Sequence, residues 1–213
     1  MMSELNIDDF REILLDNPLD SIVSRYLFSG VPYAFREEPD SENLLKQHLS
    51  QELNVEQEDV IVVGSGRVGF SLNPDNFPRG FSETSDIDVV VISDGLFDEI
   101  WMTLLSWHYP RRGMSLGRVE GDWARLRRKD IYWGWLVPSD IRYEGLSFPD
   151  ILNPLRDIST KWFNAFQSLS LIPQFASRTV SGRLYRTKKH AVQYHVEGLR
   201  LIREKIKASK EGG

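Results

Sequence analysis

Residues 86–92 (DIDVVVI) constrain the fold more than any other part of the chain. Four consecutive β-branched residues favour a strand over a helix, and the turn signal at residues 93–95 (SDG) ends it. A second β-branched run at residues 60–63 (VIVV) stops at Gly64 and predicts another buried strand. The chain is therefore expected to build a sheet around these two segments.

Helical patterns lie on both sides of these strands. Apolar residues recur at helical spacing over residues 4–29, with a break at Asn17-Pro18, and a further helix is predicted with Ser41 as its N-cap. Another should follow residues 93–95, because Phe97, Ile100 and Leu104 keep one face apolar.

The second half of the chain has a basic segment, a third predicted strand and two predicted helices. Residues 110–129 are interpreted as a basic connection, and residues 131–137 (IYWGWLV) as a strand rich in aromatic side chains. Helical periodicity returns at about residue 150, and a final helix is predicted over residues 187–210.

This order predicts an α/β (α+β) protein with a small mixed sheet flanked by N-terminal and C-terminal helices. We divide the chain into acidic N-terminal helices (1–59), an α/β core (60–149) and a basic C-terminal helical part (150–213). The three parts are expected to pack as one compact unit.

The net charge of −5 conceals a gradient along the chain. Residues 1–60 carry a charge of −10, residues 61–150 carry −3, and residues 151–213 carry +8. An anionic ligand is therefore expected to meet the C-terminal part, while the acidic helices form a solvated face or a surface for a partner protein.

The chain has no cysteine, which excludes disulfides, thiol catalysis and cysteine-ligated zinc. No apolar run approaches the ~18 residues of a membrane span, and the first ten residues are acidic where a targeting peptide would be basic. We expect a cytoplasmic protein.

Residues 64–69 (GSGRVG) match the dinucleotide-binding pattern G-x-G-x-x-G directly after a predicted strand. That pattern requires a helix beginning at the third glycine, whose N-terminus holds the pyrophosphate. Here two prolines and a glycine follow within residues 70–80, so a long helix is excluded and a nicotinamide or flavin site is disfavoured.

A different interpretation joins Gly64 and Ser65 with Asp86 and Asp88. Strand side chains alternate between faces, so the two carboxylates project to the same side, roughly 7 Å apart. Such a pair suits Mg²⁺ or Mn²⁺, which take their remaining ligands from water and a substrate phosphate. Gly64 lets the backbone approach a phosphate, and Ser65 supplies a hydroxyl and an amide.

These residues resemble the signature of the DNA polymerase beta superfamily of nucleotidyltransferases. In that family a strand ends in Gly-Ser, and a second strand carries Asp-hydrophobic-Asp, as at residues 62–65 and 85–91 here. The resemblance implies a nucleotidyltransferase sheet, an NTP substrate and a metal at Asp86 and Asp88. It is greatest to the compact bacterial members of toxin-antitoxin and antiphage systems.

Family members place a third carboxylate on the next strand, beside the first two. Residues 131–137 contain no acid, which leaves Asp130 at the start of that segment and Asp140 just after it. The loop between Ser65 and Asp86 is also longer than is usual for the family, and its Arg67 is a candidate phosphate contact.

Further phosphate contacts are predicted where the last helix begins. Cations at a helix N-terminus oppose the macrodipole, so an anion bound there would relieve the repulsion. The candidate nucleotide-binding residues are Arg183, Tyr185, Arg186, Lys188 and Lys189, with a tyrosine available to stack on a base.

The sequence thus predicts a metal-dependent enzyme that moves a nucleoside monophosphate from an NTP to an acceptor hydroxyl on RNA, protein or a nucleotide. Two alternatives stay open. One is a catalytically degenerate module of the same fold that binds nucleotide or RNA within a complex. The other is an RNA-binding protein that uses the segment from Arg111 to Lys129 together with the basic C-terminal tail.

Overall fold

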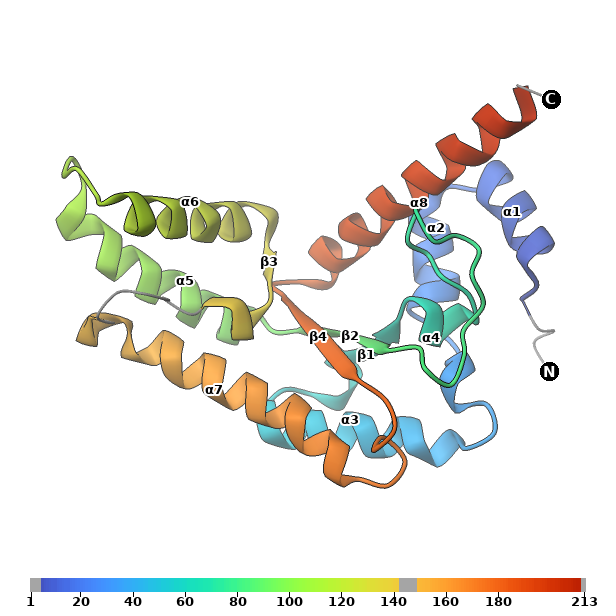
Figure 1. The fold of residues 1–213 in the computed structure, drawn as a ribbon, viewed down its shortest axis with the longest axis horizontal. Coiled ribbons are helices and arrows are strands. Elements are labelled where there is room, and N and C mark those ends of the chain that lie inside the picture. The colour runs from blue at the N-terminus through green and yellow to red at the C-terminus, as the bar shows by residue number, and fades with distance from the viewer. Residues whose placement is uncertain (1–4, 142–148, 212–213) are drawn as a thin grey trace.

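A computed structural model describes residues 5–141 and 149–211 of the chain. It shows a mixed α/β protein, mostly helical, with one four-stranded mixed sheet (Figure 1). The strands are β1 (Val60–Val63), β2 (Ile87–Ile92), β3 (Trp135–Leu136) and β4 (Val180–Tyr185). The helices are α1 (Ile7–Asp16), α2 (Leu19–Ile22), α3 (Pro39–Leu53), α4 (Ser65–Val68), α5 (Asp94–His108), α6 (Arg118–Trp133), α7 (Asn153–Ser168) and α8 (Lys188–Glu211).

The sheet has the order β1-β2-β4-β3. β1 runs antiparallel to β2, with Val63 opposite Asp88, whereas β2 and β4 run parallel, with Asp88 opposite Ser181. β3 adds a short antiparallel edge, where Trp135 pairs with Tyr185. The connection from β2 to its parallel neighbour β4 therefore contains α5, α6, β3 and α7.

Each face of the sheet is covered by its own group of helices. One apolar cluster joins Val89, Val91 and Leu184 to side chains of α3, α5, α6 and α7, while a second joins Val90 and Tyr185 to α1, α2 and α8. Figure 1 shows these two groups on opposite sides of the strands. β2 lies between the two layers and is buried along its whole length except at Asp88.

Most of the predicted elements are confirmed. β1 and β2 lie where the β-branched runs predicted them, and α5, α7 and α8 match the predicted helices. The break at Asn17-Pro18 separates α1 from α2, which continues into a single π-helical turn, Val23–Leu27. Ser41 does not cap α3, because that helix already begins at Pro39.

Two segments differ from the sequence predictions. Most of the predicted basic connection and the first part of the predicted third strand form one helix, α6, so only Trp135 and Leu136 of residues 131–137 belong to the sheet. Residues 180–185, predicted to lie in a purely helical part, form β4 at the centre of the sheet. The boundary at residue 149 therefore does not separate the sheet from the C-terminal helices.

The acidic N-terminal helices pack against the C-terminal helix of the same chain. Arg203 of α8 donates from Nε to the carbonyl of Leu14 at 2.6 Å and also contacts the carbonyl of Asn17 at the end of α1. Lys205 reaches Asp75 in the loop before β2 at 2.8 Å. These contacts join the acidic and basic ends of the chain. A partner protein on the acidic helices stays a prediction.

Gly182 lies in the middle of β4, where α7 approaches the sheet closely. A Cβ at this position would lie 2.2 Å from Cζ of Phe166 and within 3.1 Å of two further atoms of that ring. A glycine normally weakens a strand, so its presence here reflects this close contact.

We expect Gly182→Ala to lower the free energy of unfolding by about 1–3 kcal/mol, because the Phe166 ring must move to admit the new methyl group. Urea unfolding followed by circular dichroism measures the loss. Gly198→Ala is the matched control, since a Cβ there has nothing within 4 Å. Equal stability of the two variants would contradict the proposed close packing.

Among the residues that the structure describes, none of the helices combines the length and apolar character needed to cross a membrane.

Candidate functional site

The turn after β1 brings the backbone against Asp88. Gly64 has φ 64° and ψ −147°, and its carbonyl accepts hydrogen bonds from the amides of Arg67 and Val68 at 3.1 and 3.3 Å. A Cβ on Gly64 would lie 2.9 Å from Oδ2 of Asp88. Glycine readily adopts this backbone conformation, and its lack of a side chain admits a carboxylate at this short distance. Gly64 and the adjoining Ser65 therefore lie beside Asp88.

Asp86 and Asp88 lie at the beginning of β2, on the edge of the sheet where β1 ends. Asp86 precedes the strand by one residue, and Asp88 is its second residue. Both side chains are exposed, in contrast to the apolar residues between and after them. The structure therefore places Asp88 beside Gly64, as the sequence predicted, and Asp86 lies two residues before Asp88.

Several groups act on the charge of Asp88. Although its side chain is partly exposed, desolvation of the carboxyl raises the pKa of Asp88, and the neighbouring charge of Asp86 raises it further. A hydrogen bond from Ser181 Oγ to Oδ1 at 3.3 Å and the charge of Arg183 act in the opposite direction. The net effect raises the pKa of Asp88, which means that its negative charge is unfavourable in the folded protein. A bound cation would relieve this unfavourable charge.

This shift predicts that Asp88→Asn has a higher melting temperature than the wild type at pH 7. The pKa of Asp88 in the folded state exceeds its value in the unfolded chain, so ionisation destabilises the fold above the folded pKa. The difference should shrink as the pH falls through that pKa. Thermal unfolding from pH 7 to pH 3 measures it, with Asp16→Asn as an exposed control.

The predicted third carboxylate is absent from the strand beside β2. That strand is β4, in which Ser181 lies opposite Asp88 and Arg183 lies opposite Val90. β4 contains no acidic residue, and β3 is separated from β2 by β4. The structure thus puts a hydroxyl and a guanidinium on the strand where an acid was expected.

The assignments of Asp130 and Asp140 as the third acid are consequently wrong. Asp130 lies on α6 and forms an ion pair with Arg127 at 3.0 Å, while Asp140 lies in the short 3₁₀ turn Pro138–Ile141. Neither residue belongs to a strand next to β2. Within residues 5–141 and 149–211, no group of three or more His, Cys, Asp or Glu side chains could hold a metal.

Arg183 and Tyr185 share the sheet face of Asp88. The guanidinium of Arg183 donates to the hydroxyl of Tyr194, lies 5.0 Å from the centre of that ring and lies 5.5 Å from the centre of Trp135. Tyr185 is buried beneath these rings, and desolvation raises the pKa of its phenol. Arg183 is therefore a positioned, exposed cation one strand away from the carboxylates.

Arg67 does not face the carboxylates. Its side chain is buried, and its guanidinium donates from Nε to the carbonyl of Leu27 at 3.0 Å and from Nη1 to the carbonyl of Gly30 at 2.7 Å. Desolvation lowers the pKa of this guanidinium. Arg67 thus fixes the chain after the π-helical turn, and the prediction that it contacts phosphate is not supported.

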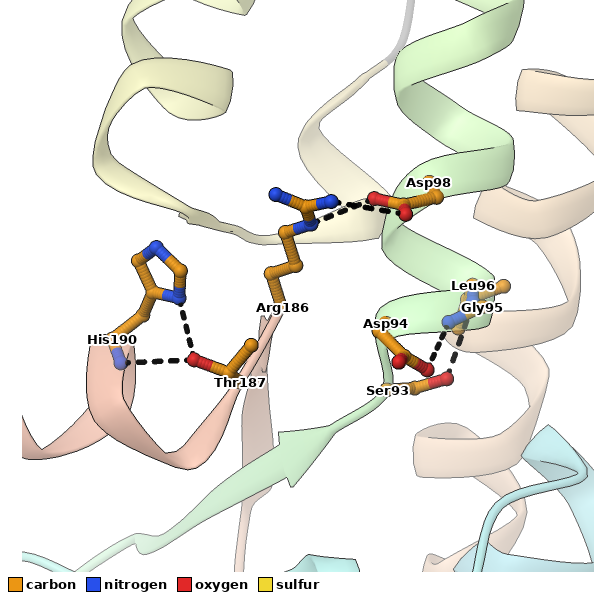
Figure 2. Close-up of polar contacts among 8 residues, drawn as sticks. All are labelled: Ser93, Asp94, Gly95, Leu96, Asp98, Arg186, Thr187 and His190. Atoms are coloured by element: carbon orange, nitrogen blue, oxygen red, sulfur yellow. Dashed lines mark hydrogen bonds and ion pairs between the residues drawn. The ribbon is translucent and has the colours of Figure 1, made fainter.

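The structure also separates the other predicted phosphate ligands from Asp86 and Asp88. Arg186, Lys188 and Lys189 follow the carboxyl end of β4, whereas Ser181, the partner of Asp88, lies near the beginning of that strand. Arg186 forms a two-point ion pair with Asp98 of α5 at 2.8 and 3.2 Å (Figure 2). Their assignment to the carboxylate site is therefore corrected.

Two helices begin together at this far end of the parallel strands. Ser93 accepts from the amide of Leu96 at 3.2 Å and caps α5, and Thr187 accepts from the amide of His190 at 3.4 Å at the beginning of α8 (Figure 2). The hydroxyl oxygens of Ser93 and Thr187 thus each accept a hydrogen bond from an amide at the beginning of a helix.

Sequence reasoning missed Ser181 and Trp135 as members of the site. The available signal was the alternation in residues 180–185, where Val180 and Leu184 face one side and Ser181, Arg183 and Tyr185 face the other. Gly182 lies between Val180 and Leu184 on the apolar face and has no side chain. The alternation is therefore a weaker indication of a strand.

Comparisons with protein families, with curated proteins and with solved structures find no match for this chain.

Proposed function

We propose that Gly64, Ser65, Asp86 and Asp88 bind a metal-complexed nucleoside triphosphate, from which the protein transfers a nucleoside monophosphate to an acceptor hydroxyl. The observation that carries the proposal is the contact of the Gly64 turn with Asp88, which unites the two halves of the nucleotidyltransferase signature. The mixed sheet, with β1 antiparallel and β4 parallel to β2, supports a sheet of that type.

The residues present fit one hard divalent cation. Mg²⁺ accepts one or two carboxylates and completes its octahedron with water and phosphate oxygens, and Asp86 and Asp88 supply those two carboxylates. The raised pKa of Asp88 means that the ionised carboxylate is unfavourable without a counter-charge. A bound cation would supply that counter-charge. When bound, Mg²⁺ or Mn²⁺ would orient the triphosphate and stabilise its developing negative charge.

The chain itself holds and orients the triphosphate. Ser65 offers a hydroxyl beside Gly64, where the lack of a side chain lets the carboxylate of Asp88 approach the backbone. Arg183 presents a cation on β4, the strand next to β2, where it contacts Trp135 and Tyr194. In the reaction the acceptor oxygen bonds to the α-phosphorus, the bond to the bridging oxygen breaks, pyrophosphate leaves, and the hydroxyl proton passes to solvent water.

A second candidate function is favoured by a specific observation. Ser181 and Arg183 stand on the strand where the family carries its third carboxylate, so the site has fewer anionic ligands than a two-metal site requires. A protein of this kind would bind a nucleoside triphosphate without transferring it, as a nucleotide-responsive subunit of a complex.

Two measurements on the full chain separate these functions. The first is transfer of label from each α-labelled ribonucleoside triphosphate, with Mg²⁺ or Mn²⁺, into total cell RNA and protein. The second is equilibrium binding of the same nucleotides. Transfer that is lost in Asp86→Ala supports the enzyme, binding without transfer supports the second function, and the absence of both from folded protein overturns the proposal.

Ser181→Asp tests whether the missing acid limits the site. The new carboxylate would lie beside Asp88, so we expect Mg²⁺ to bind about tenfold more tightly, with increased transfer. Ser181→Asn is the control, because it has nearly the same shape but no charge. Isothermal titration with Mg²⁺ compares the two, and equal affinities would show that position 181 does not contribute to the metal site.

A further inference from the structure

The carboxyl end of α6 exposes two neighbouring aromatic side chains. Tyr132 is 78% exposed and Trp133 is 53% exposed, and their ring centres lie 5.1 Å apart in an edge-to-face arrangement. The buried residues of α6, Trp123 and Ala124, face the protein. Two large aromatic rings in contact form a contiguous exposed patch, and this feature, rather than a single exposed side chain, indicates a contact surface.

Basic side chains accompany these rings. Residues 109–133 contain seven basic and three acidic residues, in a chain whose net charge is −5. Arg125 and Arg127 are paired with Asp122 and Asp130. By contrast, the exposed side chains of Arg112, Arg118, Arg128 and Lys129 form no ion pair or hydrogen bond with any part of the chain that the structure describes.

The cations and the rings share one side of the helix. At 100° per residue, Arg118, Lys129, Tyr132 and Trp133 project within a sector of roughly 100°, and Arg128 projects about 40° beyond it. α6 borders the outside of the molecule in Figure 1, next to α5. We define these five residues as the α6 surface.

We propose that the α6 surface binds single-stranded nucleic acid. Phosphate groups complement its unpaired cations, and exposed bases stack on aromatic rings without regard to sequence. An acidic protein would satisfy the cations but would make no comparable use of the two rings. The proposal goes beyond nucleotide binding at Asp86 and Asp88 and does not depend on it.

The path from this surface to the carboxylates follows two strands. Trp133 is joined through Gly134 to β3, where Trp135 pairs with Tyr185 of β4. Arg183 then lies between Trp135 and Ser181, which bonds to Asp88. The α6 surface therefore adjoins the carboxyl end of β4, at the opposite end of that strand from Ser181.

Fluorescence anisotropy with labelled ~12-nucleotide oligouridylate and oligothymidylate tests the proposal, on the full chain without nucleotide or metal. We expect Tyr132→Ala/Trp133→Ala to weaken binding about tenfold or more, through lost stacking. Arg128→Gln/Lys129→Gln should weaken it similarly and reduce the slope of log affinity against log salt by about 1.4. The RNA and DNA probes together show which strand is preferred.

Matched controls come from exposed positions elsewhere. Lys207→Gln/Lys210→Gln removes two cations from α8, and Leu171→Ala removes an apolar side chain that is 83% exposed. Circular dichroism establishes that each variant is folded. The proposal is overturned if the wild type binds neither oligonucleotide at low salt, or if the control lysine pair matters as much as Arg128 and Lys129.

Competition by polyglutamate gives a further decisive outcome. Displacement of the oligonucleotide by an equal charge of polyglutamate, with no effect of the aromatic substitutions, would identify an acidic protein as the partner and refute nucleic-acid binding. Asp86→Ala should bind the oligonucleotides like the wild type. Failure of nucleotide binding at the carboxylates is thereby distinguishable from failure at α6.

Discussion

Asp86→Ala and Asp88→Ala are each expected to reduce metal-dependent nucleotide transfer by about 100-fold or more, while the fold stays intact. Each change removes one of two neighbouring carboxylates, of which Asp88 lies against the Gly64 turn. Because both side chains are exposed, neither replacement opens a cavity in the core. Transfer of α-labelled nucleotide gives the rate, and circular dichroism confirms the fold.

The two aspartates should differ in their effect on stability. Asp88 accepts a hydrogen bond from the hydroxyl of Ser181 and has a raised pKa, so its loss removes an unfavourable charge together with one hydrogen bond.

The control for the transfer measurements is Asp16→Ala at the end of α1, which should leave transfer unchanged. Wild-type rates in either Asp86→Ala or Asp88→Ala would refute the assignment of these residues to the site.

Gly64→Val is expected to have the largest combined effect on stability and ligand binding. The backbone at φ 64° and ψ −147° is accessible to glycine but strained for a β-branched residue, and the first added carbon would already lie 2.9 Å from Oδ2 of Asp88. We expect a loss of about 2–4 kcal/mol in the free energy of unfolding.

Nucleotide binding should disappear in Gly64→Val even under conditions where the protein stays folded, because the valine occupies the space beside Asp88. Urea unfolding and equilibrium nucleotide binding measure the two effects. Gly80→Ala, in the same loop, is the control, since nothing lies within 4 Å of a Cβ at that position. Similar behaviour of the two variants would show that the close contact at Gly64 is unimportant.

The predictions from sequence succeeded where structure is local. The runs at residues 60–63 and 86–92 combine β-branched side chains with clear turn signals, and both are strands. Because they are consecutive antiparallel neighbours, the approach of Gly64 to Asp88 follows from their pairing. The two carboxylates and the glycine turn could therefore be predicted to lie together.

The predictions failed where a segment's own preference competed with distant contacts. Residues 131–133 favour a strand by composition, yet they complete α6, whose buried residues Trp123 and Ala124 pack against the rest of the protein. The helix ends at Gly134 in the left-handed region, which leaves only two residues for the edge strand. Residues 118–129, predicted to lie in a basic connection, instead belong to this helix, with Arg118, Arg125 and Arg128 exposed and Arg127 largely buried.

The sequence by itself determined the two buried strands, their flanking helices and the pair of carboxylates at Asp86 and Asp88, because these depend on neighbouring residues and alternating side chains. Only the tertiary structure decided which strand lies beside β2. Residues 180–185 join the sheet about ninety positions later through backbone pairing, which leaves little trace in a segment containing Ser, Gly and Arg. That pairing puts Ser181, rather than an acid, opposite Asp88.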